Sequence, residues 1–425
     1  MMVTYDIYKR RKSDGKRMTL IQDFLSLSLD LNWSGRSKFS ISGEGAKVCP
    51  LDVGDYIVVI RNAELLFSGI VKTVEIECQN VIAGTIGWTV SGEDDSVIFD
   101  WRIILTESDT SVQFDDITFG NDAYDKCEAD AYTRMVHYIR NCYDKTKTMS
   151  SRAISGLVFP DPANVPSSQR GETALSAYRM KKLSDVLKEI GEEYNLFAQY
   201  SWSPVTGRKE IQIPVQRNKT RTIIISPQFG NVSNWSATRT FPQFNAVWVC
   251  SGEYEVIEDE GTENEKKYST RIWVYAEDTE SIKTYGRIEA TVTKSDIKVQ
   301  EDDEETEEDE TLTEEDVIEL LEEEARKQLQ DNGAKEKYSI TLADTETMHF
   351  MSDWKCGDLV KVIIDYDQNT GKPKSFEATI ETVSITYENL VEKVVPTIGQ
   401  PEEGLFGQVF EMISGIDKRL QNEEE

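Results

Sequence analysis

A short β-strand pattern occurs twice in this chain, once near each end. Residues 53–60 read VGDYIVVI and residues 356–363 read CGDLVKVI, so in both copies a Gly-Asp turn leads into a run rich in β-branched residues. Farther along, residues 71–76 (VKTVEI) resemble residues 380–385 (IETVSI). A repeated turn, hairpin and alternating strand predict two similar β units in one chain. A Gly-Asp turn before a strand is also common in unrelated barrels, so the similarity has a second explanation without duplication.

The two copies differ mainly in the length of one hairpin loop, at residues 365–374, which absorbs a difference of about six residues. This loop resembles a calcium-binding loop, but an EF-hand needs Gly at its sixth position and Glu at its twelfth. Here Gly371 falls at the seventh position and Glu377 at the thirteenth, so a hairpin turn is favoured. The candidate repeat turns are formed by Gly54 and Asp55 in the first copy and by Gly357 and Asp358 in the second.

Strand signals surround both copies, and three segments between them have helical spacing. Residues 24–31 (FLSLSLDL) alternate apolar and polar side chains, as a half-buried strand does. Helical spacing occurs at 122–143, at 181–195 and after Thr313, where Asp316 occupies the capping-box position. We expect an α+β fold that is mainly β, with two similar antiparallel β-barrel (tube-type) domains, α+β insertions and a C-terminal amphipathic helix. The expected domains are a first β-barrel at 1–108, an α+β domain at 109–220, a second β-barrel at 221–398 with an inserted hairpin and acidic helix at about 254–336, and the C-terminal helix at 399–425.

Charge and composition exclude several classes of protein. Among 425 residues, 77 are acidic and 47 are basic, which gives a net charge of −30. No window is apolar enough for a transmembrane helix, and the N-terminus has no signal-peptide core. Clustered Lys and Arg, which grip nucleic acid or anionic membranes, are missing. Over half of the net charge lies in residues 301–324, which contain sixteen Asp or Glu.

The residues of common catalytic and metal sites are scarce. The six cysteines form no CxxC pair, and we expect them to be small buried hydrophobic residues. The two histidines, His137 and His349, are isolated in the sequence, and there is no HExxH, P-loop, GxGxxG or GxSxG motif. We therefore expect no enzyme activity, and we assign no catalytic, cofactor-binding or metal-binding residue.

An apolar stripe with the 3-4-3-4 spacing of a coiled coil lies near the C-terminus. Two heptads fit a coiled coil at an oligomer or partner interface, and they fit an amphipathic helix packed on its own chain equally well. The candidate interface residues are Phe406, Val409, Ile413, Ile416 and Leu420.

Two similar barrels around an α+β insert, followed by an acidic helix, resemble the baseplate hub or tail-tip hub proteins of tailed bacteriophages and related injection machines. The resemblance rests on residues 51–77, 182–190, 281–287 and 402–420, and it covers most of the chain. It implies a structural protein that forms a trimeric ring with pseudo-sixfold symmetry, closes the tail tube, carries the tip or spike, and lets DNA pass during genome ejection.

The resemblance also implies partners and a location. The partners are distal tail or tail-tube proteins above, tip, spike or receptor-binding proteins below, and the C-terminus of the tape-measure protein, without sequence-specific binding of nucleic acid. The location is the virion, at the tail tip or baseplate, after assembly in the host cytoplasm. A trimer would carry about −90, three times the charge of one chain, and an acidic bore would repel the phosphates of passing DNA.

The alternative function is a tail adhesin that binds host cell-wall polysaccharide. Eight tryptophans and seventeen tyrosines could line a sugar-binding face. Trp88, Trp248 and Trp273 lie in strand-like segments, where we expect them to be buried in the core. Trp202 is the aromatic residue that this hypothesis would expose.

Overall fold

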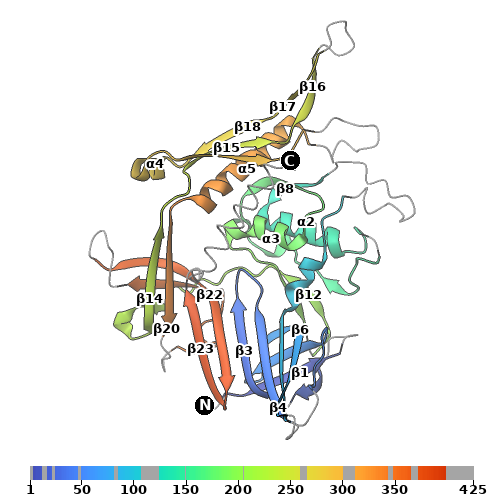
Figure 1. Ribbon diagram of the computed structural model, residues 1–425, viewed down its shortest axis with the longest axis vertical. Coiled ribbons are helices and arrows are strands. Elements are labelled where there is room, and N and C mark those ends of the chain that lie inside the picture. The colour runs from blue at the N-terminus through green and yellow to red at the C-terminus, as the bar shows by residue number, and fades with distance from the viewer. Residues whose placement is uncertain are drawn as a thin grey trace.

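The protein is an elongated, mainly β molecule, as the sequence predicted (Figure 1). The computed structural model describes residues 3–11, 17–21, 24–45, 49–80, 85–106, 124–148, 150–203, 205–258, 266–299, 312–342, 348–364 and 372–398. The acidic segment 301–311, the loop 365–371 and the expected C-terminal helix with its stripe from Phe406 to Leu420 lie outside the described residues. No helix in the described part of the chain is long and apolar enough to cross a membrane.

One large, mostly antiparallel sheet forms the lower half of the molecule. Its strands follow the order β14-β20-β23-β22-β3-β4-β7-β6-β5-β1-β2, and β21 pairs with both β22 and β13 beside this path. The strands are β1 (Tyr5–Arg10), β2 (Arg17–Ile21), β3 (Phe24–Asn32), β4 (Lys38–Gly45), β5 (Tyr56–Arg61), β6 (Glu64–Asn80), β7 (Thr85–Asp94), β13 (Ile224–Ile225), β14 (Val232–Thr240), β20 (Lys335–Leu342), β21 (Leu359–Ile364), β22 (Lys374–Glu388) and β23 (Val391–Ile398).

No closed barrel is found in the described part of the chain, so the expectation of two β-barrel domains is not confirmed. Among the described residues the strands form a single open path, because β22 of the second unit pairs with β3 of the first. The reason is strand length: β22 has 15 residues and its hairpin partner β21 has 6, so the second half of β22 is free to pair with another strand. One hydrophobic core, with residues from both ends of the chain, lies against this shared sheet.

A smaller α+β module with its own core packs above the sheet. Its helices are η1 (Asp95–Trp101), α2 (Ala131–Tyr143), η2 (Pro162–Asn164), η3 (Ser167–Gln169), α3 (Leu183–Gly191) and η4 (Glu192–Tyr194), and its strands are β8 (Asp125–Asp130), β9 (Leu157–Val158), β10 (Thr173–Tyr178), β11 (Gln199–Trp202) and β12 (Lys209–Gln212). The sequence predicted a helix from residue 122, but the chain forms β8 first, paired with β10. The helix begins after Asp130 because that side chain accepts a hydrogen bond from the Thr133 backbone and caps α2.

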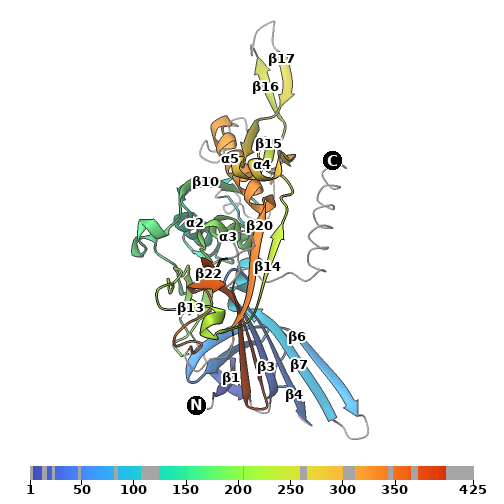
Figure 2. The ribbon, with the colours of Figure 1, turned by 90° about the vertical axis from the view of Figure 1, so that its left-hand side faces the viewer.

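A third core lies at the upper end of the molecule, between a small sheet and one long helix. The predicted capping box is confirmed, because Thr313 and Asp316 exchange hydrogen bonds at the start of this helix. The remaining elements are η5 (Pro227–Phe229), β15 (Ala246–Ser251), β16 (Tyr254–Glu258), β17 (Lys266–Thr270), β18 (Trp273–Glu277), α4 (Thr279–Tyr285), β19 (Glu289–Lys294) and α5 (Glu314–Asn332). The β16–β17 hairpin projects from the end of the molecule (Figure 2).

Candidate assembly interface

The two Gly-Asp turns have the same backbone geometry. In the first, Gly54 N–H donates to Val71 O (2.9 Å) and Val71 N–H donates to Asp55 O (2.8 Å). In the second, Gly357 N–H donates to Ile380 O (2.8 Å) and Ile380 N–H donates to Asp358 O (2.9 Å). Both glycines have a positive φ, 77° and 89°, which is the left-handed conformation that favours glycine.

The aspartate of each turn is buried and has two kinds of partner. Asp55 accepts a hydrogen bond from the Asp52 backbone (2.8 Å) and pairs with Lys9 Nζ (2.5 Å). Asp358 accepts from the Lys355 backbone (2.8 Å) and receives two hydrogen bonds from Arg217, at 2.7 and 2.6 Å. A buried carboxylate therefore closes each turn onto the backbone three residues earlier. The sequence pattern identified the turns but not the cations, which are far away along the chain.

Aligning the two turns shows that equivalent strands have different neighbours. Val71 and Ile380 make the same hydrogen bonds, so Ile76 in β6 is the counterpart of Ile385 in β22. Ile385 is 0% exposed, because β22 has β23 on one edge and β3 on the other. Ile76 is 59% exposed, because beyond Val71 the described part of β6 pairs only with β7. Figure 2 shows β6 and β7 extending beyond the other strands. Sequence reasoning missed this open edge.

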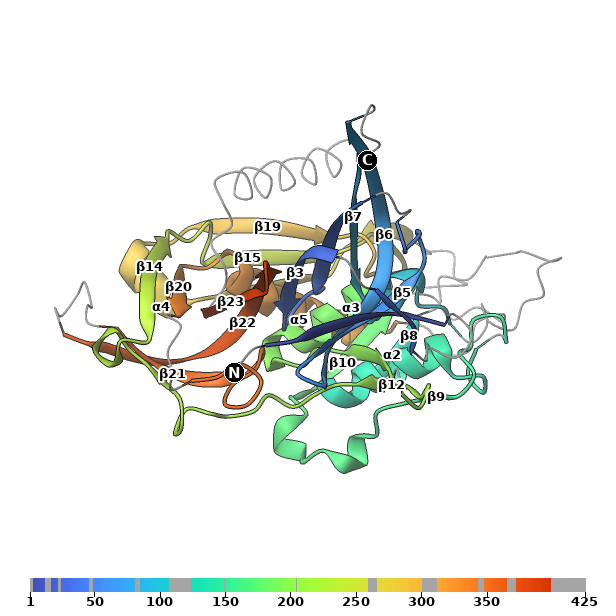
Figure 3. The same cartoon turned by 90° about the horizontal axis from the view of Figure 1, so that it is seen from below.

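A second open edge lies at the opposite side of the sheet, in β14 (Figure 3). Within the described residues β14 pairs only with β20. Like β3, it carries a bulge near its start: the register shifts between Phe24 and Ser26 in β3 and between Val232 and Asn234 in β14. β14 thus resembles β3, the strand that fills the edge of β22.

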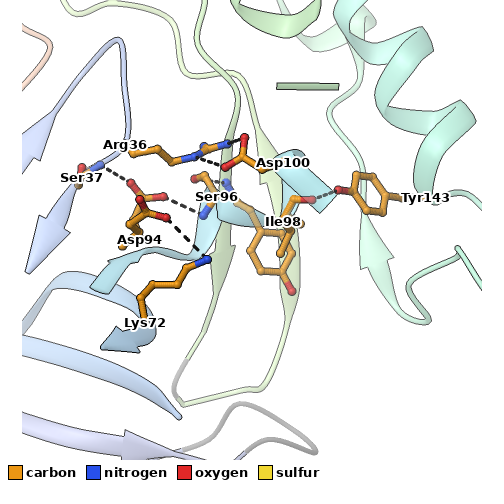
Figure 4. A network of polar contacts seen from close by, with 10 residues as sticks. Arg36, Ser37, Lys72, Asp94, Ser96, Ile98, Asp100 and Tyr143 are labelled. Carbon is orange, nitrogen blue, oxygen red and sulfur yellow. Dashed lines mark hydrogen bonds and ion pairs between the residues drawn. The ribbon is translucent and has the colours of Figure 1, made fainter. Parts of the chain in front are cut away.

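A network of polar contacts holds the base of the β6–β7 extension (Figure 4). Asp94, at the end of β7, accepts hydrogen bonds from the backbone N–H groups of Ser37 (2.5 Å) and Ser96 (2.8 Å). Burial raises the pKa of Asp94, and these hydrogen bonds only partly offset that effect. Arg36 pairs with Asp100 (3.1 Å), and Tyr143 Oη donates to Ile98 O (2.7 Å), which joins η1 to α2. The extension therefore starts from a fixed base.

The tryptophans are distributed differently from the sequence-based expectation. Trp88 is buried, as expected, but Trp248 and Trp273 are 42% and 52% exposed. Trp202 is buried, because its ring packs beside Arg10 and Lys209, so it offers no surface to a saccharide.

The cysteines differ in their exposure to solvent. Cys142 and Cys250 are buried, as expected, whereas Cys78 in β6 is exposed. In the described ranges, no group of three His, Cys, Asp or Glu side chains comes together that could hold a metal ion.

A partly buried ion pair joins β5 to β23. Arg61 donates two hydrogen bonds of 2.7 Å to Glu392, which also accepts one from the Tyr5 hydroxyl. Burial alone would raise the pKa of Glu392, but the hydrogen bonds from Arg61 and Tyr5 outweigh it and lower this pKa below its ordinary value. Because the folded pKa is the lower one, the pair stabilises the fold above the unfolded pKa, about 4.3, and this stabilisation is lost as the pH falls through the folded pKa.

We expect Glu392→Gln to reduce the free energy of unfolding by about 1–3 kcal/mol at pH 7, because it removes hydrogen bonds to a charged group. The difference from wild type should shrink as the pH falls from the unfolded pKa, about 4.3, through the lower folded pKa of Glu392, since protonation removes the same charge in the wild type. Urea unfolding at several pH values measures both quantities. Glu388→Gln, on the same hairpin but exposed, is the control. A pH-independent difference for Glu392→Gln would contradict the assignment.

Comparison with known proteins supports a common origin over nearly the whole chain. No curated protein matches it. The 43 kDa tail protein of prophage MuSo2 from Shewanella oneidensis is 13% identical, with a TM-score of 0.52 over 93% of this chain and 97% of that one, and it shares the fold. Two further structures are more distant. A tail protein from Neisseria meningitidis has 12% identity and a TM-score of 0.46, and the match covers 95% of this chain and 98% of that one. Prophage tail protein gp18 from Listeria monocytogenes has 11% identity and a TM-score of 0.45, and the match covers 98% of this chain and 99% of that one. The model of the Siphovirus ReqiPepy6 Gp37-like protein family matches residues 7–400. The chain is a phage tail protein and belongs to this family.

Proposed function

We propose that this protein is the structural hub of the tail tip or baseplate, and that three chains form a ring with pseudo-sixfold symmetry. The ring closes the tail tube, carries the tip or spike, and lets DNA pass during ejection. Its partners are the tail-tube proteins above, the tip proteins below and the tape-measure C-terminus. The proposal includes the domain limits near residues 108, 220 and 398 and a contact made by the stripe from Phe406 to Leu420. It assigns the protein no catalytic role.

The observation that carries the proposal is the junction between β22 and β3. This junction joins the second β unit to the first inside one chain, with Ile385 opposite Leu29. The open edges of β6 and β14 are the counterparts of β22 and β3. β14 stands at one end of the strand path, and the open part of β6 lies beyond the residues that pair with β5. If β6 of one chain pairs with β14 of the next, the same junction recurs between chains. Aligning the bulges of β14 and β3 then places Ile76 opposite Ala237 of the neighbouring chain.

Repetition of this contact gives a closed ring. The contact joins two different edges, so it is a head-to-tail interface, and such interfaces close into rings when the rotation fits. Each chain supplies two similar units, so three chains supply six. Closure also covers the free edges of β6 and β14, and free sheet edges otherwise invite aggregation. The net negative charge of such a ring would repel DNA phosphates, so that DNA passes without binding.

The test is the solution mass of the purified chain, compared with that of an Ile76→Lys variant. We expect a wild-type mass near three times 48.4 kDa. The Ile76→Lys variant should have the mass of one chain. An unpaired charge at the interface costs several kcal/mol, which weakens association at least about a hundredfold. Static light scattering measures both masses.

Leu65→Lys is the matched control, because Leu65 lies in the same strand and is also exposed, but in the half of β6 that already pairs with β5. It should remain trimeric. A wild-type monomer would contradict the ring. A trimer that survives Ile76→Lys would contradict the β6–β14 contact.

The alternative, a tail adhesin for host cell-wall polysaccharide, loses its original candidate because Trp202 is buried. Another surface of the molecule has the side chains that such binding needs, and it adds to the hub function rather than replacing it.

A further inference from the structure

The small upper sheet has one covered face and one open face. Its strand order is β18-β15-β19, and α5 packs along β15 and β18 on one side (Figure 1). The side chains toward α5 are small and aliphatic, such as Val247, Val249 and Val274. The opposite side carries Trp248, Trp273 and Tyr275, which we call the aromatic face. The platform is rigid because the helix holds it from behind.

The aromatic side chains form a compact group on adjacent strands. Trp248 of β15 lies directly opposite Tyr275 of β18, with ring centroids 4.6 Å apart and an interplanar angle of 43°. Trp273 lies one row along β18, opposite Cys250. The exposed fractions are 42% for Trp248, 36% for Tyr275 and 52% for Trp273. Exposed clusters of large aromatic residues mark interaction sites on soluble proteins.

A fixed polar edge borders the aromatic face. Arg287 donates to Tyr275 Oη (2.6 Å), to Glu277 (2.6 Å) and to Glu289 (3.2 Å), and the Tyr275 hydroxyl donates to Glu277. The guanidinium is therefore held in one plane beside the rings, with carboxylates on both sides. This edge presents hydrogen-bond donors and acceptors together.

The size and charge of this face select its ligand. With strands about 4.8 Å apart and one side chain every 6.8 Å along each face, the platform measures roughly 10 Å by 14 Å. A stable protein interface needs about 800 Å² per partner, far more than this area. The two carboxylates disfavour anionic ligands such as nucleic acid. A neutral saccharide fits both features, because its C–H faces stack on aromatic rings and its hydroxyl groups both donate and accept hydrogen bonds.

We propose that the aromatic face binds a neutral saccharide chain, with sugar rings stacked on Trp248 and Trp273 and hydroxyl groups bonded to Arg287, Glu277 and Glu289. This site is separate from the ring contact, which uses β6 and β14 in the large sheet. It would let a structural tail protein also touch a surface polysaccharide of the host.

The test is a titration of tryptophan fluorescence with three soluble tetrasaccharides. Chitotetraose and cellotetraose are neutral, and the hyaluronan tetrasaccharide is anionic. We expect saturable binding of at least one neutral chain below about 10 mM, a weak but ordinary affinity for a shallow site, and weaker binding of the anionic chain. Trp248→Ala and Trp273→Ala should each weaken binding at least tenfold. Trp101→Ala, which removes an exposed tryptophan of η1 elsewhere, should change it less than twofold.

Three outcomes would overturn the proposal. The first is no saturable binding of either neutral chain, and the second is an equal loss of binding in the Trp101→Ala control. The third is a Trp248→Ala variant that changes the solution mass while no saccharide binds, because the face would then be a contact between copies of the chain. The wild-type mass alone tests the ring, so failure of the saccharide site and failure of the hub function give different results. Circular dichroism of each variant confirms that it folds.

Discussion

Replacing Asp95 with alanine is expected to reduce the free energy of unfolding by about 3–5 kcal/mol, the usual effect of removing one partner of a buried ion pair. The side chains of Arg10 and Asp95 are 0% and 1% exposed, and the two charges are 2.5 Å apart. Asp95 also accepts a hydrogen bond from Ser68 (2.7 Å). Without the carboxylate, the Arg10 guanidinium would stay buried beside the rings of Tyr56 and Trp202 with no opposite charge.

This pair stands where the large sheet meets the α+β module. Arg10 belongs to β1, Asp95 to η1, and the Arg10 guanidinium lies 3.4 Å from the backbone oxygen of Trp202 in β11. Losing Asp95 should therefore weaken both the sheet and its attachment to the module. Urea unfolding monitored by tryptophan fluorescence measures the change.

Two variants make the test specific. Glu280→Ala removes one partner of an exposed pair with Lys283, whose side chains are 80% and 69% exposed, and should change stability by less than about 0.5 kcal/mol. Arg10→Met combined with Asp95→Ala removes both charges and should recover part of the loss, because no uncompensated charge remains. A change below 1 kcal/mol for Asp95→Ala would show that the pair contributes little.

Replacing Gly357 with alanine is the second large effect. The φ of Gly357 is 89°, and an added Cβ would lie 2.1 Å from Cε3 of Trp33. The left-handed conformation costs about 1–2 kcal/mol for a residue with a side chain, and the overlap with the indole ring adds about 1–3 kcal/mol. We expect a total loss of about 2–5 kcal/mol, because both the turn and the ring are held by their neighbours.

Gly156→Ala separates these two causes. Gly156 has a φ of 72°, but an added Cβ there would meet nothing within 4 Å. It should therefore show only the conformational cost, about 1–2 kcal/mol. Thermal unfolding of both variants gives the comparison. Equal losses would mean that Trp33 moves aside freely and that the indole does not hold the second turn in place.

The local features were predictable from the sequence because neighbouring residues determine them. The capping box at Thr313 needs only its own turn of helix, and the Gly-Asp turns need only a glycine and a short acidic side chain. The start of α2 was predicted too early. Asp130 is a good N-cap, but it lies in the middle of a segment whose apolar spacing continues on both sides, so the spacing did not show where the helix begins.

The open faces were not predictable in the same way, because they depend on distant packing. Large aromatic and small aliphatic side chains alternate along β18, which indicates a strand with two different faces. α5 packs on the face that carries Val274 and Ala276. Small side chains allow a helix to approach closely, so the larger aromatic residues remain outside. One signal was present in the sequence. Glu277 lies on the same face of the strand as Trp273 and Tyr275, because alternate residues share a face, and a charged residue on a face indicates that it points to solvent.

Ile76 shows the limit of a single-chain pattern. The alternation through Val74 and Ile76 is that of a half-buried strand, and its counterpart Ile385 is fully buried. Among the described residues, Ile76 has β7 on one side but no strand on the other edge of β6, and a sequence does not say which chain supplies that strand.

The pairing of β3 with β22 also has a consequence for synthesis of the protein. Asp30 and Ser384, which share a hydrogen bond across this junction, are 354 residues apart in the chain. β3 leaves the ribosome well before β22, the strand that covers its edge. At about 5–20 residues per second, β3 waits on the order of tens of seconds with one edge unpaired. The sheet therefore cannot be completed before β22 emerges, and until then the nascent chain needs protection from premature strand pairing.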